Sequence, residues 1–500
     1  MAASSLMGAM VVGAGWWTQI QYGKIGLLMD PIEVLHRLGR WSTGRGPLYL
    51  LLAARLRQLI DAGELPPGTG LPPDRVFARS LSVGRSTVVA AYGLLEGEGR
   101  IVRRQGSGTR VAGAPTAAPK TTSAPMFLHL LEPDPQVISL ACAAPGAPPP
   151  EMTAAFAAIL PELASTTADI GYHPAGCSTL REAIAQRYTR LGAPTPADRI
   201  LVTNGGQQAL SLLARAFITP GDRVLLETPT YPGALEAFRE QAAVLDALPV
   251  GFTGFEAAVR AHRPAVGYLT PTFQNPTGTV LPRLVRRRIA EVAAAAGVPL
   301  IADEVLADLG FPGEVMPPFA VDSDDAISIG SLSKSMWGGL RIGWIRAPRP
   351  VIERVTRLRA VHDLGGNLPA QLAAARLVPQ LDLLCANHAA QRQSCHDTLL
   401  GALGAHLPDW TVSAVRGGQT LWVRLPYGDG NSFAQTALRH GVAVLAGNGL
   451  DVSGGSGEYI RLHFRHPEST LTAAVARLAT AWDDYRPPAR PATAPPPLAV

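Results

Sequence analysis

The sequence predicts two domains of different class, a small α+β domain followed by a large α/β domain with a mainly parallel sheet. From about residue 137 to 480, short β-branched runs alternate with longer Ala- and Leu-rich helical runs, as in the crossover units of parallel sheets. The stretch VAGAPTAAPKTTSAP, residues 111 to 125, has the composition of a linker. A chain of 500 residues also exceeds what one core normally holds.

Composition favours a globular cytosolic protein over a membrane protein or a disulfide-rich one. Apolar residues make up 47% of the chain and charged residues 17%, which is typical of well-packed cores. The four cysteines, at 142, 177, 385 and 395, have neither CxxC nor metal-ligand spacing and fit reduced thiols. The apolar stretch LMGAMVVGAGWW is too short to span a bilayer and no Lys or Arg precedes it, so we expect no export signal and no membrane partner.

Positive charge is concentrated before the linker. Between Arg40 and Arg110 there are eleven arginines, no lysine and five acidic residues, whereas the whole chain carries a net charge of only +5. The remainder is therefore close to neutral. A small basic module on a neutral body predicts a polyanion as the partner of that module.

The basic module has the pattern of three helices followed by a hairpin. Apolar residues from Leu48 to Ile60 recur at helical spacing. After a Pro- and Gly-rich turn come the short helical run DRVFARSL, the turn SVG and a second helical run, RSTVVAAYGLLEGEG. Two helices joined by so short a turn form a helix-turn-helix, whose second helix can enter the major groove. The run GRIVRRQGSGTRV then predicts two strands with a glycine-rich tip, a wing.

This module resembles the winged helix-turn-helix of GntR-type bacterial regulators over nearly its whole length. LPPGTGLPPDR, RSTV, AYGLLEGEG and RQGSGT occur in the family's order and spacing. The resemblance implies that double-stranded DNA is the partner, contacted by Arg75, Arg85, Ser86, Thr87, Arg103, Arg104 and Gly106. The planar guanidinium fork of arginine suits such contacts because it binds phosphate or guanine bidentately. Gly84 replaces the family's usual serine and removes one phosphate contact.

In the large domain the stretch SLSKSMWGGLRIGW, residues 331 to 344, places one lysine among small and apolar neighbours. A lysine used for Schiff-base chemistry needs a lowered pKa, which burial supplies. The two serines, Ser331 and Ser333, and the nearby Arg341 offer hydroxyl donors and a fixed positive fork for a phosphate. Lys334 is therefore the candidate reactive residue.

Four further motifs at strand ends point to the same cofactor. The motif TNGGQQAL opens a helix, so the amides of Gly205, Gly206 and Gln207 can hold a phosphate. TPTYPG supplies a ring, Tyr231, for stacking on a heterocycle; QNPTG supplies Asn275 as a donor to a phenolic oxygen. LIADE ends a strand at Asp303, a carboxylate that can keep a pyridine nitrogen protonated. Together these motifs describe pyridoxal 5'-phosphate (PLP).

Residues 137 to 480 resemble the fold-type-I aminotransferases, with SxSK, the arginine seven residues on, NPTG and ADE as the diagnostic pieces. The resemblance implies a fold-type-I α/β domain with a smaller C-terminal α+β subdomain. It makes Lys334 the internal aldimine and assigns the other cofactor contacts as above. It further implies that Arg461 grips a substrate or effector carboxylate and that Tyr172 reaches the phosphate of a partner subunit. Leu306 stands where the family commonly has a second tyrosine for the phenolic oxygen.

A winged helix, a linker and an aminotransferase-like domain in this order resemble the MocR-type regulators. The resemblance implies a cytoplasmic, PLP-dependent transcriptional regulator that senses an amino acid, an amine or PLP itself through the Lys334 aldimine, and a head-to-tail homodimer. It is then not a dedicated enzyme. Two alternatives stay open: an active aminotransferase with an accessory DNA-binding domain, and a PLP protein whose module binds another protein. We expect these segments: 1–40 a partly flexible extension, 41–112 the winged helix-turn-helix, 113–136 the linker, 137–485 the PLP domain and 486–500 a disordered tail.

Overall fold

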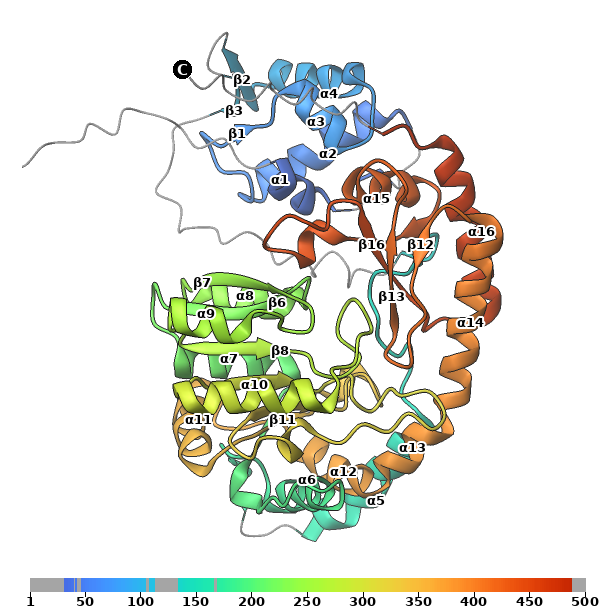
Figure 1. The fold of residues 1–500 in the computed structure, drawn as a ribbon. Coiled ribbons are helices and arrows are strands. Elements are labelled where there is room, and N and C mark those ends of the chain that lie inside the picture. Colours follow the sequence, from blue (N-terminus) through green and yellow to red (C-terminus); the bar gives the residue numbers. More distant parts are fainter. Residues whose placement is uncertain are drawn as a thin grey trace, which may run out of the picture.

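The computed structural model describes residues 31–39, 41–42, 46–104, 108–112, 134–165 and 169–487. Most of the predicted extension, linker and tail, and the wing-tip residue Gly106, therefore lie outside the described residues. In Figure 1 the N-terminal domain is blue, the large domain runs from teal through green and yellow to light orange, and most of the C-terminal subdomain is orange to red.

The N-terminal domain is α+β, as predicted. Its helices are α1 (Pro31–Leu38), α2 (Leu48–Asp61), α3 (Asp74–Ser80) and α4 (Arg85–Gly97), and its strands are β1 (Gly70–Leu71), β2 (Ile101–Arg104) and β3 (Gly108–Val111). The strands form an antiparallel sheet in the order β1-β3-β2. Phe77 of α3 and Tyr92 of α4 stack in the core, 6.0 Å between ring centroids, so α3 and α4 hold the geometry of a helix-turn-helix.

The large domain is built on a seven-stranded sheet in the order β5-β11-β10-β9-β8-β6-β7. Only β11 pairs antiparallel with its neighbours, so the prediction of a mainly parallel sheet is confirmed. The strands are β5 (Ile200–Thr203), β6 (Arg223–Thr228), β7 (Val244–Pro249), β8 (Val266–Leu269), β9 (Leu300–Asp303), β10 (Ile327–Ser331) and β11 (Gly343–Arg346).

Helices cover both faces of this sheet because its strands are apolar on both sides. One face packs on α7 (Gly206–Phe217), α8 (Pro232–Glu240) and α11 (Arg349–His362). The other packs on α9 (Phe255–His262) and α10 (Arg283–Ala296), and on α5 (Pro150–Ser165), α6 (Ser178–Arg190) and α12 (Leu368–Leu377). Short 3-10 helices occupy Ala197–Arg199, Phe319–Val321, Gly338–Leu340, Val378–Gln380 and Gly447–Leu450.

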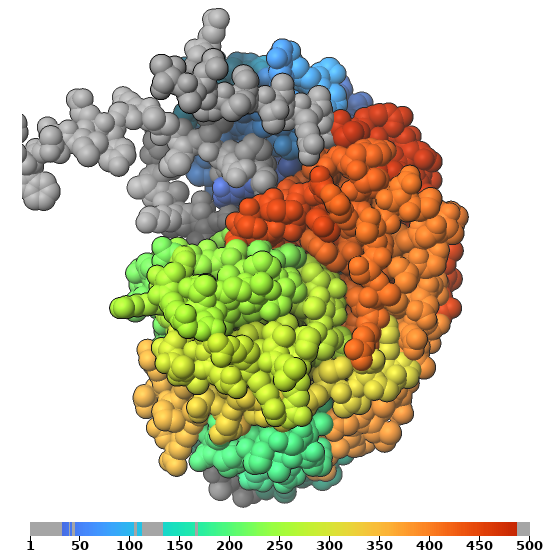
Figure 2. Space-filling view, viewed as in Figure 1, coloured from blue at the N-terminus to red at the C-terminus, as the bar shows by residue number. Residues whose placement is uncertain are grey.

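The C-terminal subdomain is α+β and has its own core. After α13 (Leu381–Asn387), the long helices α14 (Ala389–His406) and α16 (Glu468–Asp484) pack together, and α15 (Gly430–Arg439) lies on α16. Its antiparallel sheet has the order β12-β13-β16-β15, from Thr411–Val412, Thr420–Arg424, Tyr459–His463 and Leu445–Ala446. The space-filling view shows this subdomain lying against the large domain, with the N-terminal domain beyond it (Figure 2).

The chain re-enters the C-terminal subdomain directly after the linker. Strand β4 (Ile138–Ser139) pairs in parallel with β14 (Val442–Ala443), and the following residues run toward the carboxyl edge of the large sheet. Within the described ranges, no helix is long and apolar enough to cross a membrane.

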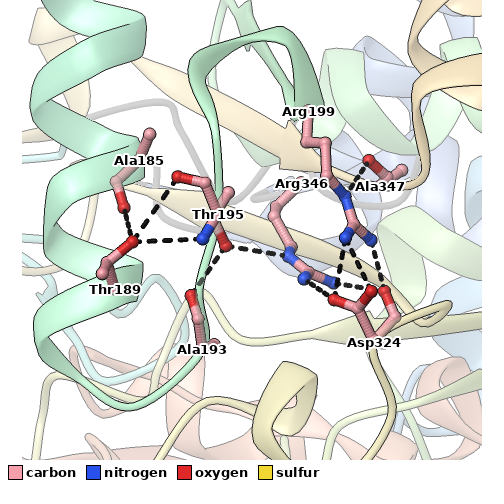
Figure 3. A network of polar contacts seen from close by, with 8 residues as sticks. All are labelled: Ala185, Thr189, Ala193, Thr195, Arg199, Asp324, Arg346 and Ala347. Carbon is pink, nitrogen blue, oxygen red and sulfur yellow. Dashed lines mark hydrogen bonds and ion pairs between the residues drawn. The ribbon is translucent and has the colours of Figure 1, made fainter.

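A buried arginine ties strand β11 of the large sheet to the loop before β10 (Figure 3). Arg346 of β11 is completely buried and donates to the Asp324 carboxylate, to the Asp324 carbonyl oxygen at 2.6 Å and to Thr195 Oγ1 at 3.3 Å. Arg199 donates to the same carboxylate at 2.7 and 2.8 Å. One aspartate carboxylate thus pairs with two guanidinium groups.

We expect Asp324→Ala to lower the free energy of unfolding by about 2–3 kcal/mol, because it leaves the buried Arg346 charge with neutral acceptors only. Chemical denaturation of the purified protein measures this loss. Asp325→Ala is the matched control, since the neighbouring side chain is exposed and takes no part in the network drawn in Figure 3. Equal stability of the two variants would contradict the assignment.

Candidate functional site

The residues predicted to bind the cofactor follow the carboxyl ends of neighbouring strands. Gly205 follows β5, Tyr231 follows β6, Asn275 follows β8, Asp303 ends β9 and Lys334 follows β10. These ends lie at one edge of the sheet because the five strands run the same way. Ligands of open α/β sheets bind at this edge.

Lys334 is half-buried at the centre of this group. Its Nζ donates to the carbonyl oxygen of Ala143 at 2.7 Å. Burial lowers the pKa of Lys334 to about 8; nearby Cys142 opposes this shift, and the positive charge of Arg461 adds to it. At pH 7 roughly a tenth of such amines are unprotonated, far more than for an ordinary lysine. The site therefore supplies the neutral amine that a lysine nucleophile needs.

Asp303 is buried beside a tyrosine that belongs to none of the predicted cofactor motifs. Tyr268 of β8 donates from its hydroxyl to Asp303 Oδ2 at 2.8 Å, and the Val305 amide donates to Oδ1 at 3.1 Å. Burial raises the pKa of Asp303, and these two hydrogen bonds oppose the rise. Burial also raises the pKa of Tyr268 well above its ordinary value, so the phenol keeps its proton.

Arg461 comes from β16 of the C-terminal subdomain and reaches the same site. It is 6% exposed, and it donates to Asn275 Oδ1 at 3.0 Å and to the Ala141 carbonyl oxygen at 2.5 Å. Burial lowers its pKa to about 10. Its Nε is buried and has no hydrogen-bond partner among the described residues, which leaves a donor for an incoming anion.

The phosphate end of the predicted site has a backbone that only glycine fits. Gly205 precedes α7 with φ +83°, and a Cβ there would lie 3.0 Å from Arg341 Nη2. Arg341 donates to the Asn204 carbonyl oxygen at 2.5 Å, so its guanidinium is held at the start of the helix. Ser331 is buried, with its hydroxyl between Ser333 Oγ and the Ile342 carbonyl oxygen. Positive charge and a helix N-terminus together favour a phosphate.

Tyr231 and Gln207 close one side of the site. The Tyr231 hydroxyl donates to Gln207 Oε1 at 3.1 Å, and Gln207 Nε2 donates to the Gly233 carbonyl oxygen at 2.9 Å. Burial raises the pKa of Tyr231 to about 12, and the Asp303 charge adds to the rise. A neutral ring held in this way can stack on a flat heterocycle.

Two predicted features stand apart from this group. Tyr172 is 62% exposed, so its own chain does not enclose it. Leu306 is buried against Phe273 and Leu309, in an apolar cluster. A cavity of about 480 Å³ between α6 and the loop after β9 shares Ser331 with this group, but its lining includes neither Lys334 nor Arg461.

The residues present fit PLP. The glycine at 205, where a Cβ would crowd the Arg341 guanidinium, leaves the start of α7 open to a phosphate, and the unpartnered Arg461 Nε suits the carboxylate of an amino compound. Arg341, Gly205 and Gly206 would hold the phosphate, Asp303 the ring nitrogen, Asn275 the phenolic oxygen and Lys334 the aldehyde carbon. When bound, PLP supplies an electron sink for amino compounds.

The predicted DNA-contacting residues lie on one part of the N-terminal domain. Arg85, Ser86 and Thr87 form the first turn of α4, and Arg75 lies on α3. Arg85 Nε donates to Asp74 Oδ2 at 2.7 Å. On the wing strand β2, the Arg103 guanidinium lies 5.7 Å from the centroid of the Tyr92 ring, and Arg104 is exposed. Gly84 caps α4 without a side-chain hydrogen bond.

Comparison with known families agrees with both halves of this arrangement. Residues 137–478 match the family described as "Aminotransferase class I and II", and residues 48–111 match "Bacterial regulatory proteins, gntR family". The chain belongs to the class I and II aminotransferase family. Members of this aminotransferase family depend on PLP, so the predicted cofactor is confirmed, and the predicted MocR-type fusion is confirmed as well. The gntR-type module of this family member implies DNA binding.

Relatives of this aminotransferase-family chain include regulators and enzymes. The HTH-type transcriptional regulator YdfD of Bacillus subtilis (strain 168) is 28% identical over 466 residues, 84% of this chain and 93% of YdfD. The probable rhizopine catabolism regulatory protein MocR of Rhizobium meliloti is 30% identical over 355 residues, 66% of this chain and 71% of MocR. The crystal structure of LysN, an alpha-aminoadipate aminotransferase from Thermus thermophilus complexed with N-(5'-phosphopyridoxyl)-L-leucine, is 26% identical with a TM-score of 0.65, covering 70% of this chain and 93% of LysN.

Proposed function

We propose that this chain is a transcriptional regulator that senses an amino acid, an amine or PLP at the Lys334 site and changes its DNA binding in response. The observation that supports it is a half-buried lysine with a pKa of about 8, among the other predicted cofactor residues, in a chain that also carries a helix-turn-helix. A sensor needs different ligand affinities in two states rather than turnover. A DNA target supports a cytoplasmic location for this regulator.

The segments predicted above, 41–112 for DNA and 137–485 for the cofactor, are the functional units of this proposal. The proposed assembly is a head-to-tail dimer. Tyr172 and Ile170 support it, because they are 62% and 83% exposed on a single chain. Large side chains exposed side by side mark association surfaces, and a partner would bring Tyr172 to the neighbouring phosphate site. Two modules would then face two half-sites on DNA.

The test is titration of the purified protein with DNA from upstream of its own gene, in the presence of PLP and a panel of amino acids and amines. Salt-dependent binding that one compound shifts would support the regulator.

The second candidate is an aminotransferase with an accessory DNA-binding domain, favoured by the complete set of Lys334, Asp303 and Arg461 around one site. Steady turnover of an amino donor and a keto acid, with DNA binding that never responds, would establish this candidate instead.

Arg85→Ala is expected to weaken binding to this DNA by about 1–3 kcal/mol, as loss of a base or phosphate contact at the start of a recognition helix does. Fluorescence anisotropy with a labelled duplex measures the change. Arg57→Ala is the control, because Arg57 lies on α2 in the same domain and also pairs with a carboxylate, that of Glu98. Equal weakening by both variants would argue against a specific role for Arg85.

A further inference from the structure

The N-terminal domain docks on the C-terminal subdomain through the turn between α3 and α4. Arg439 of α15 donates to the carbonyl oxygens of Leu81 at 3.3 Å and Ser82 at 3.0 Å. Thr436 Oγ1 donates to Ser82 Oγ at 3.3 Å, and Trp41 Nε1 donates to Gln435 Oε1 at 3.2 Å. Figure 1 shows α15 next to the N-terminal domain. This contact fixes the helix-turn-helix against the C-terminal subdomain.

An open groove of about 520 Å³ lies at this contact and is strongly basic. Five arginines line it: Arg75 and Arg79 from α3, Arg85 from the start of α4, and Arg439 and Arg486 from the C-terminal subdomain. The lining contains one carboxylate, that of Asp484, which pairs with His440 at 3.2 Å. Among the described residues, neither Arg75 nor Arg79 has an acidic partner within ion-pair distance.

Arg486 is held beside the groove by its neighbour in sequence. Tyr485 is 1% exposed and its hydroxyl lies 2.7 Å from Ser432 Oγ, so the backbone at this point is anchored to α15. Arg486 Nη1 donates to the carbonyl oxygens of Asp483 at 2.6 Å and Tyr485 at 3.0 Å. The side chain remains exposed. It therefore presents a fixed positive charge next to the start of the recognition helix.

We propose that this groove binds a phosphate group of the DNA backbone, with Arg486 as a phosphate contact supplied by the C-terminal subdomain. Arg439 is a positioning residue, because its guanidinium is committed to the Leu81 and Ser82 carbonyl oxygens. Phosphate contacts fix the register of a protein on DNA without reading sequence. The inference rests on the proposed DNA-binding function and adds that the effector-binding half of the chain contributes to that binding directly.

The salt dependence of DNA binding tests the inference. Each phosphate contact adds about 0.9 to the slope of log affinity against log salt. Arg486→Ala is expected to reduce the slope by about this amount and to weaken binding several-fold, equally on DNA from upstream of the gene and on an unrelated duplex. Arg486→Lys, which keeps the charge, should restore most of the slope. Arg260→Ala is the control, since its side chain is 77% exposed on the large domain.

An unchanged slope in Arg486→Ala would overturn the inference, and so would tighter binding, which would mean that the C-terminal subdomain obstructs DNA. A loss confined to the upstream DNA would also overturn it, because a backbone contact does not distinguish sequences. Failure of the unaltered protein to bind any DNA would instead remove the proposed function. The two failures are therefore distinguishable.

Discussion

Lys334→Ala is expected to abolish covalent attachment of PLP and, with it, every response of DNA binding to amino compounds. The absorbance band of lysine-bound PLP, at roughly 410 to 430 nm, should be absent from the variant. DNA affinity without any added compound should stay within about twofold of that of the cofactor-free unaltered protein, because the lysine lies in the large domain rather than in the DNA-binding module. Absorbance and anisotropy on the same samples measure both effects.

The chain offers an unusually clean control for this experiment. It contains only three lysines, Lys24, Lys120 and Lys334. Borohydride reduction of the holoprotein should place the cofactor mass on the peptide that carries Lys334, and Lys120→Ala should keep the absorbance band. Cofactor mass on another lysine, or an intact band in Lys334→Ala, would refute the assignment.

The same lysine predicts a pH dependence. Nζ must be unprotonated before it can bond to the cofactor aldehyde, and its pKa is about 8. The rate at which the absorbance band appears after PLP is added to cofactor-free protein should therefore rise with pH and level off above about 8. A rate that keeps rising toward the ordinary lysine pKa of about 10.4 would mean that burial does not tune this amine.

Arg461→Gln is expected to weaken the response to amino acids by at least about 30-fold, since loss of a buried charge partner for a carboxylate costs about 2–5 kcal/mol. The response to amines without a carboxylate should change little. The concentration of each compound that half-shifts DNA binding is the measurement.

Arg424→Gln is the matched control for this change. It lies on β13, the strand that pairs with β16, and its side chain is 55% exposed at a distance from the site. Retention of the PLP absorbance band in Arg461→Gln would show that the site is still folded. Equal losses for amino acids and amines would contradict a carboxylate contact.

The motif-bearing part of the site was open to prediction because each motif sits where a parallel strand ends. Asp303, Asn275 and Gly205 are placed by local sequence, and the parallel sheet then brings them to one edge. Tyr268 is the one residue of the buried strand β8 with a polar group on its side chain, so the sequence marks it as unusual. The local sequence does not show, however, that its hydroxyl donates to Asp303.

Contacts between distant segments could not be predicted from patterns. The acceptor of Lys334 and one of the acceptors of Arg461 are the main-chain oxygens of Ala143 and Ala141, which carry no side-chain signature. The docking of Arg439 on Leu81 joins residues 358 positions apart. Strand β11 is antiparallel to its neighbours, an exception to the alternation that predicts the rest of the sheet. Such features depend on how preformed elements pack rather than on periodicity.

The short strand β4 has a practical consequence for anyone who separates the two halves of this protein. It pairs with β14 and leads within a few residues to the oxygens that hold Lys334 and Arg461. A fragment that begins after Ala143 would lose both acceptors and one strand of that pair. Truncation boundaries should therefore fall before Asp134, where the described residues resume, so that the fragment keeps the main-chain oxygens that line its own binding site.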